Sequence, residues 1–202
     1  MKTSFVLAFL ALPLGTLAAQ QPAAPPSPNP AAAANPFTTT LRGRTLAYQR
    51  NLAQAFDSIP ANIFGYSPTP AQQTIGFVAQ HLANDNYLFC ERFGAMQANR
   101  PTVDTATPDS VKAKWPRDSL ITKLKASFKF CEDAYGQLDD AKLLEATSIT
   151  FGGQSRPTTR LAMALGHITD MAEHYSQIAN YMRLNKILPP TALPRPPRPA
   201  GT

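Results

Sequence analysis

A long amphipathic helix near the C-terminal end of the chain constrains the fold more than any other feature. Its apolar or small side chains recur in alternating steps of four and three, at Leu161, Leu165, Ile168, Ala172, Tyr175, Ala179 and Met182. This period places them along one face of a helix with about 3.6 residues per turn. One apolar face needs other elements to cover it, so the pattern favours helices packed in a bundle.

Three other segments repeat the helical pattern. Together with the C-terminal segment, they predict four helices, over about residues 38–59, 70–98, 118–138 and 158–186. Pro60 closes the first of them, and Thr69 or Pro70 begins the second. Asp118 or Ser119 is expected to cap the third, and Ser155 or Thr158 to start the fourth.

The remaining segments read as connections. Short helical turns are expected near residues 110–114 and 139–146, and a loop over residues 147–157, which contain Gly152 and Gly153. No stretch predicts a strand convincingly. The expected fold class is therefore all-α, a four-helix bundle.

The N-terminus has the pattern of a secretory signal peptide over residues 1–19. Lys2 precedes an apolar run, residues 5–17, that is too short to span a membrane, and Ala18 and Ala19 follow it. A Pro/Ala-rich linker over residues 20–36, a bundle over 37–190 and a Pro-rich tail over 191–202 complete the expected organisation. We expect a periplasmic or secreted protein with no stable membrane insertion after signal cleavage.

The charge is mildly basic. The formal net charge is +6, without a dense Lys/Arg run or a recognisable nucleic-acid-binding module. Nucleic acid is therefore not expected as a partner.

Cys90 and Cys131 are the only cysteines, and both fall within predicted helices. In an exported protein a disulfide between the two helices is the favoured interpretation, and two separate buried thiols are the alternative.

All three histidines lie on two of the predicted helices. Asp170 and His174 are one helical turn apart and can hold one ion, whereas His167 and His174 are separated by roughly 10 Å along the axis. His81 from the second helix would complete a set of two imidazoles and one carboxylate, which suits Zn, Ni, Mn or Fe. Asp85, one turn after His81, is expected to contact the ligands rather than the metal. His167 is kept as an alternative ligand or as a second residue that contacts the ligands.

The alternative is that each histidine is an ordinary core or rim residue without a metal. Periodicity alone does not decide between these interpretations, because it cannot show that the second and fourth helices face each other.

Several segments resemble a known family. They are Ile75 to Leu82, Trp115-Pro116, Glu173 to Asn185 and Ile187 to Pro190. In this order they resemble the DinB family of metal-binding four-helix bundles, over about residues 37–190. The family typically has one metal-ligating histidine in the second helix and a His-x-x-x-His pair in the fourth. The resemblance thus implies His81 and His174 as ligands and departs from the pattern at Asp170, where a histidine is usual.

The resemblance implies a divalent-metal protein and leaves the reaction open. Related members include metal-dependent transferases and isomerases that use low-molecular-weight thiols. We expect either an exported metal-dependent hydrolase or thiol transferase with an unidentified small-molecule substrate, or a non-catalytic periplasmic bundle that binds a small ligand or a partner protein. A homodimer is compatible with both.

Overall fold

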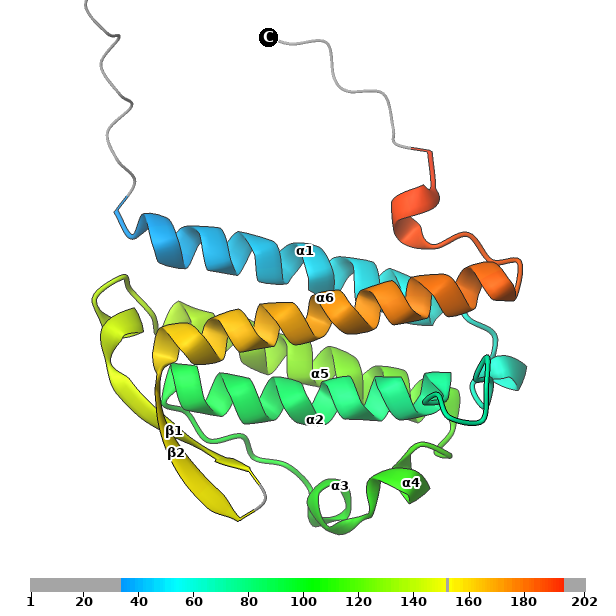
Figure 1. Ribbon diagram of the computed structural model, residues 1–202, viewed down its shortest axis with the longest axis horizontal. Coiled ribbons are helices and arrows are strands. Elements are labelled where there is room, and N and C mark those ends of the chain that lie inside the picture. Colours follow the sequence, from blue (N-terminus) through cyan, green and yellow to red (C-terminus); the bar gives the residue numbers. More distant parts are fainter. Residues whose placement is uncertain (1–33, 152, 195–202) are drawn as a thin grey trace, which may run out of the picture. The chain divides into compact units, whose positions relative to one another are not determined.

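Four long helices make up most of the computed structural model, which describes residues 34–151 and 153–194. They are α1 (Pro36–Ser58), α2 (Ile75–Gly94), α5 (Arg117–Gly136) and α6 (Arg160–Leu184). Both α1 and α2 pack against α5 and against α6 (Figure 1). The described part confirms a mostly helical fold. The expected signal peptide and most of the linker and tail lie outside the described residues.

The apolar stripes of the long helices meet in a core made of two clusters. Its largest cluster draws fully buried side chains from every long helix, among them Leu52, Phe56, Val78, Leu82, Leu124, Met171 and Ile178. A second cluster surrounds the disulfide Cys90–Cys131, which joins α2 to α5 and confirms the expected pairing. Within residues 34–151 and 153–194, no helix combines the length and the apolar character needed to cross a membrane.

Helix α2 begins later than its sequence suggests. Residues 70–74 were expected to be helical, but Thr74 is the N-cap, and its hydroxyl accepts a hydrogen bond from the Phe77 amide at 3.1 Å. The amides of Ile75 and Gly76 donate to the Tyr66 and Phe64 carbonyls in the preceding segment. These hydrogen bonds fix where α2 starts and therefore which face His81 occupies.

Short helices occupy the connections. The segment between α2 and α5 contains α3 (Thr102–Ala106), which the sequence did not suggest, and α4 (Asp109–Lys112), which falls near the expected turn. The 3-10 turn η2 (Lys142–Leu144) lies within the expected turn at 139–146. Two further 3-10 turns are η1 (Ala61–Ile63) and η3 (Pro190–Ala192).

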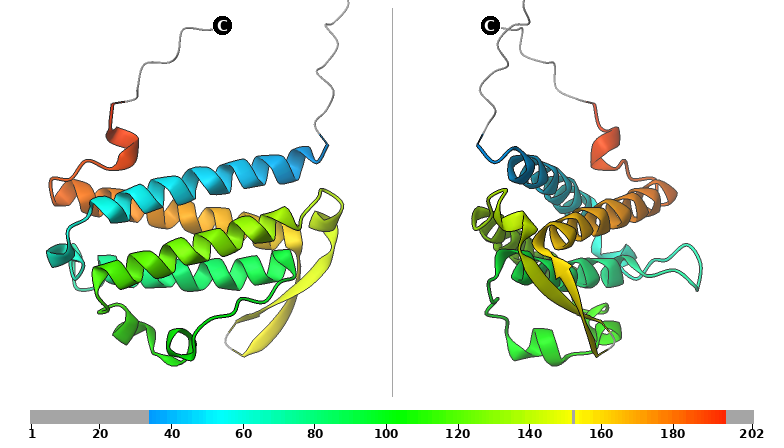
Figure 2. Two further views of the ribbon diagram at one scale, coloured as in Figure 1. Left: turned by 180° about the vertical axis from the view of Figure 1, so that it is seen from behind. Right: turned by 60° about the vertical axis from the view of Figure 1, so that its left-hand side comes forward.

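A β-hairpin replaces the loop expected at residues 147–157. Strands β1 (Ala146–Phe151) and β2 (Gln154–Thr159) pair antiparallel, with Ala146 opposite Thr159 and Phe151 opposite Gln154. The connection has two residues, and Gly153 has a φ of 78°, which glycine adopts without strain. Figure 2 shows the hairpin at the end of the helices where α6 begins. Thr159, the last residue of β2, also caps α6 through its side-chain oxygen.

Candidate metal centre

Four polar side chains face one another between α2 and α6. His81 and Asp85 lie one turn apart on α2, and Asp170 and His174 lie one turn apart on α6. The two helices run antiparallel, so the two pairs come level with each other (Figure 1). A residue pair at i and i+4 presents both side chains on the same helix face, which is why local spacing alone assembles each half of the cluster.

Asp170 lies between the two imidazole rings. Its Oδ1 is 3.4 Å from His174 Nε2 and 3.9 Å from His81 Nε2. The ring centroids of His81 and His174 are 4.8 Å apart, with the ring planes nearly perpendicular. One ligand atom from each of these three residues lies within 4.8 Å of the others. Asp85 approaches the same nitrogen of His81, with its Oδ2 3.5 Å from Nε2.

Gln177 holds the His174 ring in one orientation. Its side-chain oxygen Oε1 accepts a hydrogen bond from His174 Nδ1 at 2.9 Å, and its Nε2 donates to the Tyr181 hydroxyl at 2.9 Å. With the proton on Nδ1, Nε2 carries the lone pair that faces Asp170 and His81. Metal-ligating histidines are commonly held in this way by a hydrogen bond to the other ring nitrogen. Gln177 was not predicted from the sequence, although its spacing of three from His174 on one helix face was a usable signal.

Burial and charge act together on the cluster. The side chains of Asp170 and His174 are each 14% exposed, so the site is sheltered but reachable. Removal from water raises the pKa of Asp85 to about 6, against the opposing effect of His81. Burial alone would lower the pKa of His174, but hydrogen bonding to Asp170 and Gln177 outweighs it and raises that pKa. Among the described residues, the buried Oδ2 of Asp170 has no hydrogen-bond partner.

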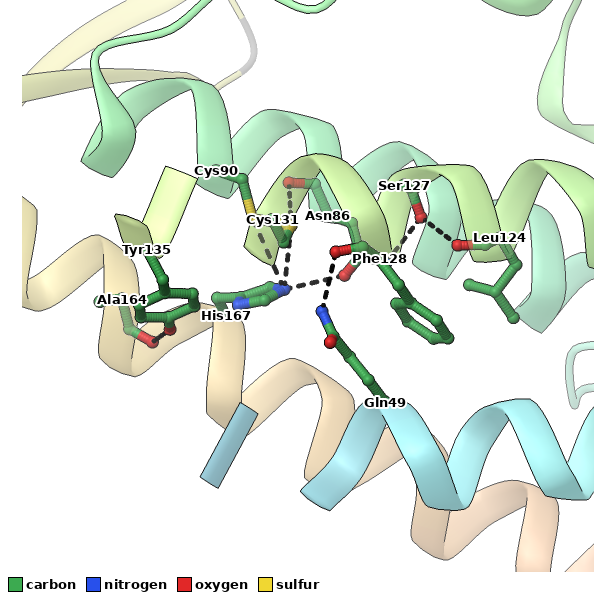
Figure 3. Close-up of a disulfide and its surroundings, with 10 residues drawn as sticks. All are labelled: Gln49, Asn86, Cys90, Leu124, Ser127, Phe128, Cys131, Tyr135, Ala164 and His167. Atoms are coloured by element: carbon green, nitrogen blue, oxygen red, sulfur yellow. Dashed lines mark hydrogen bonds between the residues drawn. A yellow bond between two sulfur atoms is a disulfide. The ribbon is translucent and has the colours of Figure 1, made fainter. Parts of the chain in front are cut away.

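His167 lies apart from this cluster, in the core beside the disulfide. Its ring is fully buried, and Nε2 is 2.9 Å from Asn86 Oδ1. Figure 3 shows the ring next to the sulfur atoms, which lie 3.8 Å (Cys90) and 3.6 Å (Cys131) from Nε2. These sulfurs and the imidazole are close enough to hold an ion. However, the disulfide leaves no thiolate for a metal, so we assign His167 to the core.

An aromatic side chain connects the cluster to a surface groove. Phe77, one turn before His81, stacks on the His81 ring with centroids 6.1 Å apart. The same Phe77 lines a groove of about 830 Å³, together with Phe64, Trp115 and Arg117. A small organic molecule in this groove would therefore be separated from His81 by the Phe77 ring.

The donor atoms of the cluster are of the kinds that bind divalent cations. Two imidazole nitrogens and one carboxylate oxygen are ligands that Zn, Ni, Mn and Fe(II) accept, and three protein ligands leave coordination positions for other groups. Of the residues suggested by the sequence, His81, Asp170 and His174 come together with Asp85 beside them, and His167 does not.

Comparison with known proteins identifies the family. Residues 45–178 match the model of the DinB superfamily, and this span contains all four residues of the cluster. A DinB-like protein from Bacillus cereus is 16% identical over 74% of this chain and 93% of its own, with a TM-score of 0.56. A conserved protein from Enterococcus faecalis is 16% identical over 73% of this chain and 96% of its own, with a TM-score of 0.54. At this identity the two structures show a shared fold, and no curated protein matches the chain in sequence. The chain belongs to the DinB superfamily.

Proposed function

We propose that the protein binds one divalent metal ion through His81, Asp170 and His174 and acts as an exported metal-dependent enzyme of the hydrolase or thiol-transferase type. The observation that carries this proposal is the convergence of these three ligand atoms within 4.8 Å, from two helices. The hydrogen bond from His174 to Gln177 adds to it, because the metal-facing nitrogen is fixed before a metal arrives.

The donor set fits a cation on charge as well as on geometry. Asp170 has a buried oxygen, Oδ2, without a partner among residues 34–151 and 153–194, and a buried unpaired carboxylate oxygen is unfavourable. The charge of Asp170 also contributes to the raised pKa of Asp85, since like charges repel in a sheltered site. A divalent cation would relieve both effects.

The remaining chemistry belongs to the protein's own groups. A divalent cation supplies Lewis acidity, which polarises a substrate oxygen and lowers the pKa of water or a thiol. Asp85, whose Oδ2 lies 3.5 Å from His81 Nε2, is placed to accept and return a proton beside the proposed ligands. Phe77 supplies an apolar surface beside His81, which would orient the organic part of a substrate and exclude water.

Metal content tests this proposal. The protein is purified without a metal-affinity column and analysed by elemental mass spectrometry, beside His174→Ala and the matched control Glu173→Gln. Glu173 is exposed and adjacent to His174, so its replacement changes charge near the site without removing a ligand. We expect about one equivalent of Zn, Ni, Mn or Fe in the parent and in the control, and almost none in His174→Ala.

A parent protein that holds no metal, even after these four ions are added back, would refute the proposal. It would then favour the non-catalytic alternative, a helical bundle that binds a small ligand or a partner protein. Circular dichroism of all three proteins separates loss of the ligand from loss of the fold.

The proposed export rests on the pattern of residues 1–19. Mass spectrometry of the protein produced in a Gram-negative host is expected to find a mature chain that begins at Gln20, in the periplasmic fraction. An intact chain that begins at Met1 in the cytoplasmic fraction would contradict export and leave the metal proposal untouched.

A further inference from the structure

A second cavity lies on another side of α2, away from the histidine cluster. It has a volume of about 260 Å³ and is bounded by α2, α5 and the segment that carries α3 and α4. Figure 1 shows α3 and α4 beside α2, on the side away from α1. Successive residues on a helix are about 100° apart around the axis, so Gln80 faces this cavity while its neighbour His81 faces α6. The two sites therefore occupy adjacent faces of one helix.

The wall of the cavity carries a connected row of polar side chains. Arg100 Nη2 donates a hydrogen bond of 2.6 Å to Asn84 Oδ1, and Asn84 Nδ2 donates one of 3.0 Å to Gln80 Oε1. All three residues line the cavity. The row fixes the Gln80 amide and the Arg100 guanidinium, so their remaining donors have set directions.

Two donors in this row are left over. Gln80 Nε2 and Arg100 Nε are both buried, and neither has a hydrogen-bond partner in the part of the chain that the structure describes. Gln80 as a whole is only 4% exposed. Buried polar groups are nearly always hydrogen-bonded, so two orphaned donors on residues that line one cavity favour an acceptor beside them.

The charge of the lining favours a negative acceptor. Arg100, Lys112 and Lys123 line the cavity together with a single carboxylate, Asp104, and Lys112 Nζ is paired at 2.8 Å with Asp109 Oδ1 outside the lining. Asp104 pairs with Lys123 at 2.5 Å, which leaves the Arg100 guanidinium without a facing carboxylate in the lining. Arg is well suited to bind a planar carboxylate through two parallel N–H groups.

Aromatic rings supply a complementary apolar surface. The Arg100 guanidinium lies 4.5 Å from the centroid of the Tyr87 ring, and Lys123 Nζ lies 5.1 Å from that of Trp115. Both rings line the cavity. A flat organic body can pack against such rings, as in many pockets that combine apolar walls with a few fixed polar groups.

We propose that this cavity binds a small organic carboxylate with a flat apolar body, whose oxygens accept from Gln80 Nε2 and Arg100 Nε. The site is separate from the proposed metal centre and stands whether or not a metal binds there. Polar contacts within the segment that bounds the cavity include a hydrogen bond from Lys112 Nζ to the Asp104 carbonyl.

Trp115 provides a direct measurement. It is the chain's single tryptophan, so its fluorescence reports on its surroundings without background from others. Benzoate is titrated into the full-length protein, with the uncharged analogue benzamide as a comparison. We expect benzoate to change the Trp115 emission in a saturable way with a Kd of roughly 1 mM or below, and benzamide to bind at least about tenfold more weakly.

Variants then locate the bound benzoate. Because Trp115 also lines the larger groove, Lys114→Met removes an exposed cation there and serves as the matched control. We expect Gln80→Leu and Arg100→Met each to weaken benzoate binding about tenfold, the usual effect of losing a hydrogen bond to a charged group, and Lys114→Met to leave it unchanged.

Two results would overturn the proposal. Absence of saturable benzoate binding would mean that water satisfies the two donors and the cavity is only structural. Benzoate binding that Lys114→Met weakens, and that Gln80→Leu and Arg100→Met do not, would place the anion in the larger groove. Elemental analysis of the same variants should show unchanged metal content, since none of the three replaces a proposed ligand.

Discussion

His167 should make the protein less stable as the pH falls below about 6.5. The ring is fully buried, and burial lowers its pKa to about 4, although the charge of Asp170 works in the opposite direction. In the unfolded chain the pKa returns to about 6.5. Between these values the unfolded state binds a proton that the folded state does not. The free energy of unfolding therefore decreases as the pH is lowered through this window.

The magnitude follows from the two pKa values. At pH 4.5 the unfolded histidine is almost fully protonated, whereas most of the folded protein still holds it neutral. The resulting loss relative to neutral pH is about 2.5 kcal/mol, a large share of the stability of an ordinary domain. Below about pH 4 the folded state also takes up the proton, and no further loss is expected from this group.

Denaturant unfolding of the parent and of His167→Gln at several pH values measures this effect. Glutamine is uncharged and can still donate to Asn86 Oδ1, the partner of His167 Nε2. Comparison with the variant is needed because Asp85, with its raised pKa, gains stability on acidification and partly hides the effect in the parent alone. The stability of the parent relative to the variant should fall by about 2.5 kcal/mol from neutral pH to pH 4.5. A difference that does not change with pH would refute a buried, neutral His167.

Three further outcomes are expected. Replacing both Cys90 and Cys131 with Ala should lower the free energy of unfolding by about 4 kcal/mol, because the disulfide closes a loop with a sequence separation of 41 residues; equal stability of the variant in denaturant unfolding would count against this. Gln177→Leu should weaken Zn²⁺ binding by about 10- to 100-fold in a chelator competition assay, with Glu173→Gln as control, because the His174 ring loses its anchor; unchanged affinity would show that the anchor is not needed. Arg117→Met should reduce stability by about 2 kcal/mol, since the guanidinium donates to the Phe56, Asp57 and Ile59 carbonyls at the end of α1; the exposed Arg92→Met is the control, and an equal loss in both variants would contradict the assignment.

The helices were predictable and the hairpin was missed for related reasons. Each long helix buries a stripe, and a stripe leaves a period in the sequence. Strand β2 is almost entirely exposed, so it leaves no alternation of apolar and polar residues. Its signal was instead the two-residue connection Gly152-Gly153 between segments that contain several threonines, a combination that is typical of a hairpin.

The candidate site shows the same division between local and distant information. Asp170 and His174 share a helix, so their spacing alone placed them together. That His81 meets them depends on how α2 packs against α6, which local periodicity does not encode; the resemblance to the DinB family supplied this pairing. The separation of His167 from the site was only partly visible, because spacing placed it too far from His174, while its fully buried position beside Cys90 and Cys131 depends on three helices at once.

The aspartate at position 170 is consistent with a working site on geometric grounds. A single carboxylate oxygen, Oδ1, faces both imidazole rings, at 3.4 Å from His174 and 3.9 Å from His81. A third histidine at this position would add a neutral ring nitrogen and no charge. The carboxylate, by contrast, attracts a protonated imidazole of either histidine, and it would also attract a bound cation. The substitution therefore keeps the two rings oriented toward a common point in the absence of a metal. It also adds a negative charge to the ligand set, which strengthens the attraction for a divalent ion in a sheltered site. Asp170 thus alters how the site is held together and keeps a ligand atom facing both rings, as the proposed metal centre requires.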